Sequence, residues 1–161
     1  MAIVFSMRKD YRVDNKILIA YASKYGSTED AAAVIGEVLS NAGAEVELIA
    51  MRKMKNFLRY NLVVLGTSIR MGKPLKEAIT FVNRYRDELK KTPAALFSVG
   101  LQMKEDTEEN REKAREFLIP LLDVIGEPVS IELFGGSIDH KKFGLALILF
   151  TLRENSVILH S

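Results

Sequence analysis

The chain has 161 residues, 48% of them hydrophobic, so it is long and apolar enough to fold as one domain around a sizeable core. It contains no cysteine, which excludes disulfides, thiolate metal sites, iron–sulfur clusters and cysteine nucleophiles, so any redox chemistry needs a bound cofactor. Lysine and arginine number 23 against 21 acidic residues and form no basic run, which argues against nucleic-acid binding.

The strand pattern begins at residue 16. Residues 1–15 are interpreted as an N-terminal extension, and residues 16–161 as a single domain in which short Val-, Ile- and Leu-rich strands alternate with segments of helical period. Strands are predicted at residues 16–22, 45–50, 61–66, 94–100 and 128–136. Several are apolar on both faces, as strands between two layers of helices are.

Two helices are predicted in the first part of the domain. One has an apolar stripe over residues 31–42 and ends at Gly43, a residue suited to a left-handed stop. The next opens with Pro74 in its first helical position and turns an apolar stripe inward over residues 75–89.

A third helix is predicted between the last two strands. It starts at Asp106, with Glu109 as the partner of a capping box, and buries the apolar residues of the segment 117–125. Pro120 is expected to bend this helix and Gly126 to close it.

Strands joined in this way by right-handed helical crossovers leave few topologies. The one that fits best is an α/β three-layer sandwich of the flavodoxin-like type, with a five-stranded parallel sheet in the order 2-1-3-4-5. Ligands of such sheets bind beyond the carboxyl ends of the strands, beside strand 1, where the strand order reverses. The segment SKYGST, residues 23–28, lies at that point.

The composition of SKYGST suits a phosphate. A helix N-terminus offers unpaired N–H groups and about half a positive charge. Three hydroxyl groups, on Ser23, Ser27 and Thr28, add donors, and Gly26 allows the backbone to bend around the anion. The segment matches neither the dinucleotide nor the nucleoside-triphosphate glycine pattern, which favours a phosphate monoester. The alternative is a plain strand-to-helix turn with Ser27 or Thr28 as N-cap.

The spacing Ser-x-x-Gly-x-Thr after the first strand resembles the phosphate loop of the flavodoxins, which holds the phosphate of FMN. Tyr25 departs from the family pattern, because flavodoxins usually carry Thr or Ser at this position. The resemblance implies cofactor contacts from Ser23, Lys24, Tyr25, Gly26, Ser27 and Thr28.

In the resembled fold, the loops after strands 3 and 4 flank the flavin ring. They correspond here to residues 66–74 and 98–106, and neither contains the Trp or Tyr that sandwiches the ring in many flavodoxins. The resemblance implies contacts from Thr67, Ser68, Ile69, Arg70, Met71, Gly72, Val99, Gly100, Leu101 and Gln102. Apolar contact is expected from Ile69, Met71, Leu101 and Met103. Gly72 is a candidate for a flexible peptide near the flavin N5 atom, or is a glycine placed for loop geometry alone.

The segments TSIRMGKP, AALFSVGL and FGGSIDHKKF resemble one branch of this superfamily, the quinone-dependent protoporphyrinogen dehydrogenases and their flavodoxin-domain relatives. The branch implies FMN, a porphyrinogen-type donor and a quinone acceptor. A sequence pI of about 8.8 suits a substrate with propionates better than it suits an acidic electron carrier. Two alternatives stay open: a flavodoxin-type carrier between redox partner proteins, and a binding module without cofactor.

Two features follow the fifth strand. His140 is a candidate proton-transfer group or an inert loop histidine, and no catalytic residue is assigned. The apolar run at 143–152 is about half of the ~20 residues that span a bilayer. It is expected to be a helix buried in the core, or else a surface for quinone or membrane contact. A cytoplasmic protein with at most peripheral membrane contact is expected, and a homodimer is left open.

Overall fold

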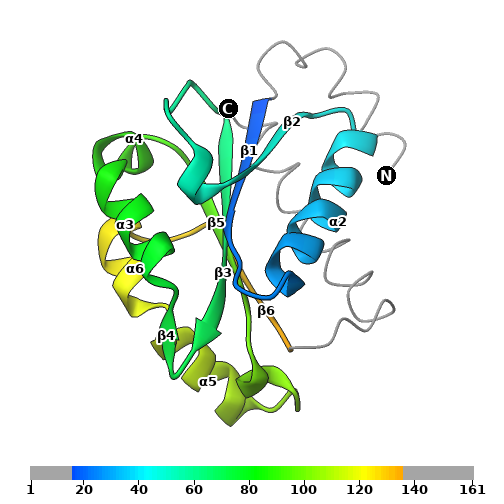
Figure 1. Ribbon diagram of the computed structural model, residues 1–161, viewed down its shortest axis with the longest axis vertical. Helices are drawn as coiled ribbons and strands as arrows, with labels where there is room; N and C mark the ends of the chain where they lie inside the picture. The colour runs from blue at the N-terminus through cyan, green and yellow to red at the C-terminus, as the bar shows by residue number, and fades with distance from the viewer. Residues whose placement is uncertain (1–15, 136–161) are drawn as a thin grey trace.

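In the computed structural model, which describes residues 16–135, five parallel strands form the sheet in the order β2-β1-β3-β5-β6 (Figure 1). The strands are β1 (Lys16–Ala22), β2 (Glu45–Ala50), β3 (Leu62–Arg70), β5 (Ala94–Val99) and β6 (Ser130–Phe134). A two-residue strand, β4 (Lys73–Pro74), pairs antiparallel with β3. The predicted order of the parallel strands is therefore confirmed, with β4 as an addition.

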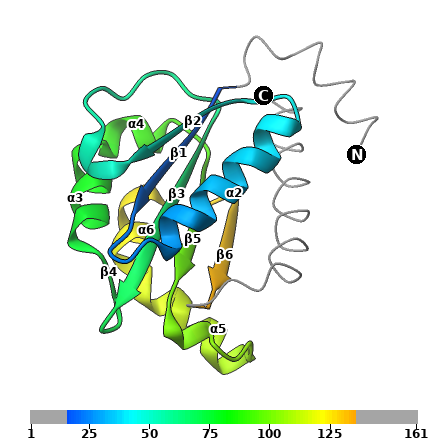
Figure 2. The same ribbon diagram turned by 45° about the vertical axis from the view of Figure 1, so that its right-hand side comes forward.

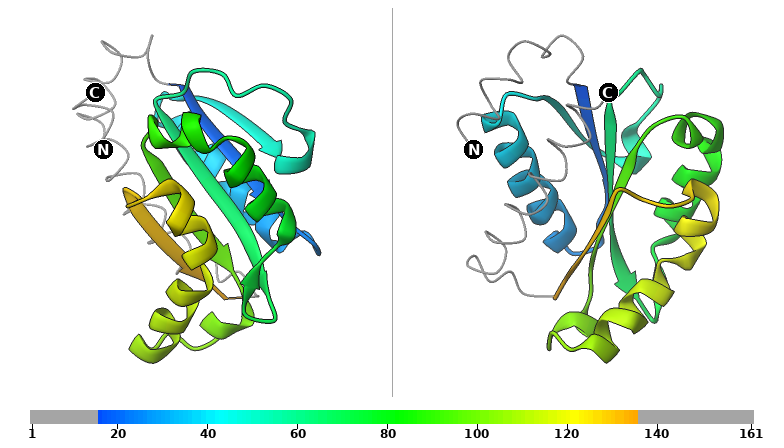
Figure 3. Two further views of the ribbon diagram at one scale, coloured as in Figure 1. Left: turned by 90° about the vertical axis from the view of Figure 1, so that its left-hand side faces the viewer. Right: turned by 180° about the vertical axis from the view of Figure 1, so that it is seen from behind.

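Helices lie on both faces of the sheet, as Figures 2 and 3 show. Helix α2 (Ser27–Asn41) covers one face. The opposite face carries the remaining helices of the described residues, with α5 near the carboxyl ends of the strands. These are α3 (Lys76–Arg84), α4 (Arg86–Lys90), α5 (Glu108–Phe117) and α6 (Ile119–Ile125). Short 3₁₀ turns, η2 (Met51–Lys53) and η3 (Leu101–Met103), follow β2 and β5.

The sheet separates two apolar cores because successive side chains of a strand point to opposite faces. In β1, Ile17 and Ile19 belong to the core on the α2 side, whereas Leu18 and Ala20 belong to the core on the other face, which includes residues of α3 and α6. Both sets are fully buried, which accounts for the continuous apolar run of this strand.

The segment predicted as one helix from Pro74 begins later and is broken. Pro74 lies in β4 opposite Ile69, and the helix starts at Lys76. It ends at Arg84, and α4 continues after Tyr85, whose φ of −104° and ψ of 27° are not helical. The prediction is wrong because a hairpin after β3 holds Pro74 in extended backbone, at a strand edge where its missing N–H costs nothing.

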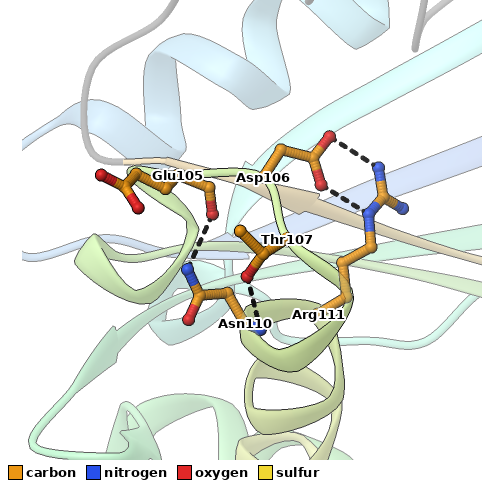
Figure 4. Close-up of polar contacts among 5 residues, drawn as sticks. All are labelled: Glu105, Asp106, Thr107, Asn110 and Arg111. Carbon is orange, nitrogen blue, oxygen red and sulfur yellow. Dashed lines mark hydrogen bonds and ion pairs between the residues drawn. The ribbon is translucent and has the colours of Figure 1, made fainter.

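The third helix has a different N-cap from the one predicted (Figure 4). Thr107 is the cap, and its hydroxyl accepts a hydrogen bond of 3.1 Å from the backbone N–H of Asn110. Asp106 instead forms two hydrogen bonds, of 2.6 and 2.9 Å, with the guanidinium of Arg111. The predicted capping box of Asp106 and Glu109 is therefore wrong, because the N-cap is the next residue along the chain, Thr107.

The end of this helical segment agrees with prediction. The helix breaks at Leu118, ahead of Pro120, and α6 continues from Ile119. It stops at Gly126, whose φ is 79°.

Replacing Thr107 by Ala should lower the free energy of unfolding by about 1 kcal/mol, the usual cost of removing an N-cap hydroxyl. Urea denaturation followed by circular dichroism measures the change. Thr92→Ala is the matched control, because that hydroxyl donates to the carbonyl of Glu88 at the end of α4 and caps no N-terminus. Equal losses in the two variants would contradict the assignment of Thr107 as a cap.

Candidate functional site

The carboxyl ends of the three central strands lie level with one another. Ala22 of β1 pairs with Thr67 of β3, and Thr67 pairs with Ser98 of β5. The segments that follow these strands therefore emerge at one edge of the sheet, beside the point where the strand order reverses. This edge holds the residues that the sequence pattern selects for a cofactor.

The first loop presents a helix N-terminus that none of its own side chains caps. Helix α2 begins at Ser27 after Gly26, which has a left-handed φ of 92°, and no side chain bonds to the first N–H groups of α2. Ser23 accepts a hydrogen bond of 3.1 Å from the Gly26 N–H, which tightens the turn. The alternative in which Ser27 or Thr28 caps the helix is therefore not what the structure has.

Thr28 joins the first loop to the third strand. Its side chain is fully buried, and its Oγ1 lies 2.6 Å from the Oγ of Ser68, so that either hydroxyl can donate. A buried hydroxyl needs a partner, and this bond supplies one across 40 residues of sequence. The two hydroxyls form a polar pair that joins the first turn of α2 to β3.

The segment after Gly66 is largely strand rather than loop, which corrects the prediction. Strand β3 continues to Arg70, and a two-residue turn leads into β4. The turn residues Met71 and Gly72 have φ values of 51° and 74°, as a type I′ hairpin turn requires. Thr67 stabilises the base of the hairpin, since its hydroxyl accepts a hydrogen bond of 3.2 Å from the N–H of Leu75.

Gly72 lies at the tip of this hairpin. Its positive φ accounts for a glycine here by loop geometry, and a Cβ would lie 3.3 Å from the ring of Phe117. Met71 beside it is 98% exposed, so its side chain makes little contact with the domain. The suggested role of Gly72 beside a flavin stays a prediction.

The segment that follows β5, the third at this edge, turns sharply after Val99. Gly100 donates its N–H to the carbonyl of Phe134, and the following residues form η3. Leu101 is exposed, whereas Met103 is buried and offers no surface at the edge, contrary to the expectation for that methionine. Gln102 donates to the side-chain oxygen of Asn110, so it is held against the start of α5. An open hollow of about 400 Å³ lies beside Leu101 and Gln102.

Tyr25 and Arg70 meet above this edge. The Arg70 guanidinium lies 5.0 Å from the centre of the Tyr25 ring, a cation–π distance, and both side chains are exposed. A hydrogen bond with Arg70 lowers the pKa of the Tyr25 hydroxyl, because the nearby positive charge favours the tyrosinate. The sequence contains no signal for this contact beyond placing both residues at the same edge.

Tyr21 has the opposite shift. Burial raises the pKa of Tyr21, and its hydrogen bond of 3.1 Å to the carboxylate of Glu29 adds to the rise. The two tyrosines of this edge are thus held in different electrostatic surroundings.

Removing the Arg70 charge should raise the pKa of Tyr25 toward its ordinary value of 10.0, because the hydrogen bond and the charge that favour the tyrosinate are lost. The pH titration of the tyrosine Cζ resonances by NMR measures this in Arg70→Gln. Glu29→Gln is the matched control with the opposite sign, since losing that carboxylate should lower the pKa of Tyr21. A Tyr25 pKa that does not change in Arg70→Gln would contradict the contact.

Some predicted features lie outside the described residues. These are His140, the apolar run at 143–152 and the extension 1–15. Between residues 16 and 135, no cluster of His, Cys, Asp and Glu is arranged to hold a metal ion. Within the same range, no helix has the length and apolarity needed to cross a membrane.

A family model described as Flavodoxin domain matches residues 18–147. A curated relative from Escherichia coli strain K12, named protoporphyrinogen IX dehydrogenase [quinone], is 27% identical over 109 residues. That alignment covers 65% of this chain and 60% of the relative, so the matching part is less than two thirds of the relative's length.

Solved structures share the fold. Oxidised Flavodoxin 2 from Bacillus cereus is 27% identical with a TM-score of 0.61, over 86% of this chain and 99% of that one. Rubredoxin oxygen:oxidoreductase from Desulfovibrio gigas superposes with a TM-score of 0.70 at 16% identity, over 91% of this chain and 37% of that one. The latter likeness concerns the fold alone.

Proposed function

The chain belongs to the flavodoxin domain family, and on that basis we propose that it binds FMN at the carboxyl edge of the sheet and transfers electrons. The proposed site comprises the turn 23–28, the end of β3 with its hairpin over 67–72, and residues 99–102 after β5. We further propose that residues 16–161 form the single domain that carries this site.

One observation carries the proposal: the N-terminus of α2 is left without a side-chain cap at the point where this fold binds ligands. Its free N–H groups and its dipole favour an anion there. A Cβ on Gly26 would have no atom within 4 Å, so the turn is open to an incoming phosphate. The chemistry of these donors therefore fits the phosphate monoester of FMN.

The surrounding residues have distinct roles in this proposal. The first N–H groups of α2 would hold the phosphate, and the buried pair of Thr28 and Ser68 holds the first turn of α2 against β3. Leu101 and the hairpin residues Ile69 and Met71 would offer apolar contact to the ring. Bound FMN would supply the redox chemistry, and Arg70 would place positive charge near a ring that becomes anionic on full reduction.

For the reaction, we propose oxidation of a porphyrinogen-type donor with a quinone as acceptor. The curated relative carries that activity in its name, and this chain has a formal net charge of +2, which suits a substrate with carboxylates. We propose that the protein is cytoplasmic with at most peripheral membrane contact, which is consistent with a quinone acceptor.

The first test is a fluorescence titration of the deflavinated protein with FMN, with riboflavin as the ligand that lacks the phosphate. Saturable FMN binding with riboflavin at least tenfold weaker is the expected result. Equal binding of the two, or none, would mean that residues 23–28 form only a turn.

A flavodoxin-type electron carrier is the second candidate. It is favoured by the match to oxidised Flavodoxin 2, which extends over 99% of that protein. Purified holoprotein incubated with protoporphyrinogen and a soluble ubiquinone analogue separates the two. Quinone-dependent appearance of porphyrin fluorescence supports the dehydrogenase, whereas its absence, together with reduction by a flavodoxin reductase, supports the carrier.

A further inference from the structure

A second cavity lies away from the proposed cofactor edge, beside η2 and α3. These two elements pack against each other where β2 ends (Figure 1). The cavity has a volume of about 370 Å³, which is within the range of small-molecule sites. No residue of the proposed FMN site lines it.

The walls of this cavity combine an apolar floor with a basic rim. Met51 and Phe81 are 2% and 3% exposed, so they form the floor. Arg52, Lys76 and Arg84 are exposed at the rim, and Glu77 is the one acidic residue among those that line the cavity. In the described part of the chain, none of the three cationic groups forms an ion pair.

Two of the three basic groups lie along one face of α3. Lys76, Thr80 and Arg84 follow at intervals of four residues, so they share one face of α3. At 1.5 Å per residue, Lys76 and Arg84 are separated by about 12 Å along the helix axis. Arg52 approaches from η2 on the other side of the floor.

We propose that this cavity binds an elongated apolar molecule with two carboxylate groups. The apolar body lies between the alkyl stems of Arg52, Lys76 and Arg84, above the buried floor, and the carboxylates pair with the cationic groups of the same side chains. Two separated anionic groups are required because the positive charges lie along the cavity rather than at one end. The proposal does not depend on FMN binding, since the two sites share no residue.

The test is isothermal titration calorimetry with dodecanedioate and with deuteroporphyrin, which represent an aliphatic and a tetrapyrrole source of two carboxylates. Each titration is run with and without excess FMN, which keeps any phosphate site occupied. Saturable binding of either probe that persists with FMN supports the proposal. The probe that binds more tightly shows whether the cavity prefers an aliphatic or a tetrapyrrole dicarboxylate. Dodecanoate, with one carboxylate, should bind at least tenfold more weakly than dodecanedioate.

Variants assign the binding to this cavity. Arg84→Gln and Arg52→Gln change exposed side chains. Each should lower the affinity for the more tightly bound probe about tenfold or more. Lys90→Gln is the matched control, because Lys90 is exposed on α4 and does not line the cavity. The proposal is overturned if neither probe binds, if Arg84→Gln behaves like Lys90→Gln, if dodecanoate equals dodecanedioate, or if FMN abolishes binding.

Discussion

Replacing Gly66 by Ala should destabilise the protein by about 3 kcal/mol, the upper end of the usual cost of overpacking a core. Gly66 of β3 lies opposite Phe97 of β5, and the ring of Phe97 rests on the glycine. A Cβ at this position would lie 2.0 Å from Cζ of that ring, far inside contact distance. Because Phe97 is fully buried under α2, the ring cannot move aside without disturbing the core that holds this helix.

Urea denaturation with Gly36→Ala as the matched control tests this expectation. Gly36 lies inside α2, where a Cβ would make ordinary contacts of 3.5 and 3.6 Å, so this variant should be stabilised by about 0.5 to 1 kcal/mol. Phe97→Leu provides the rescue, since leucine lacks the three ring atoms that the new Cβ would strike. If the double variant is as unstable as the sum of the single variants, the ring is not the cause.

Replacing Thr28 by Val should weaken FMN binding by up to about tenfold, because the lost hydrogen bond to Ser68, which holds the first turn of α2 against β3, contributes about 0.5 to 1.5 kcal/mol. Valine keeps the shape of the fully buried side chain and removes only the hydroxyl. The partner of that hydroxyl, Ser68, also loses a hydrogen bond of 2.6 Å, so the free energy of unfolding should fall by about 1 kcal/mol.

The ligand series separates an effect on the phosphate turn from an effect on the whole site. Riboflavin lacks the phosphate, so its affinity should be the same in Thr28→Val and in the unmodified protein. Thr92→Val is the control variant, since Thr92 follows α4 and bonds to the Glu88 carbonyl. Equal losses of FMN and riboflavin affinity would show that the pair of Thr28 and Ser68 supports the whole site rather than the phosphate turn.

The order of the elements could be read from the sequence because the information is local. The apolar run at 16–22 and the stripe at 31–42 have the periods of a buried strand and a one-sided helix, and both elements are found there. Gly43, predicted to end the first helix, has a φ of 100°. Local composition also predicts an anion site at the turn 23–28, since its hydroxyls and glycine lie between a strand and a helix, and that site stays a proposal.

Only the tertiary structure decided how the edge of the sheet is built. Thr67 and Ser68 are predicted in the loop after the third strand, but pairing with β1 and β5 keeps them extended. The contacts of Thr28 with Ser68 and of Tyr25 with Arg70 join residues that are more than 39 positions apart in sequence. No local pattern encodes such contacts, because they depend on strand register and on the hairpin that places Arg70. The sequence by itself determined the kind of fold and the position of the turn that is proposed to bind an anion, and the packing of β3 between its neighbours decided which side chains meet there.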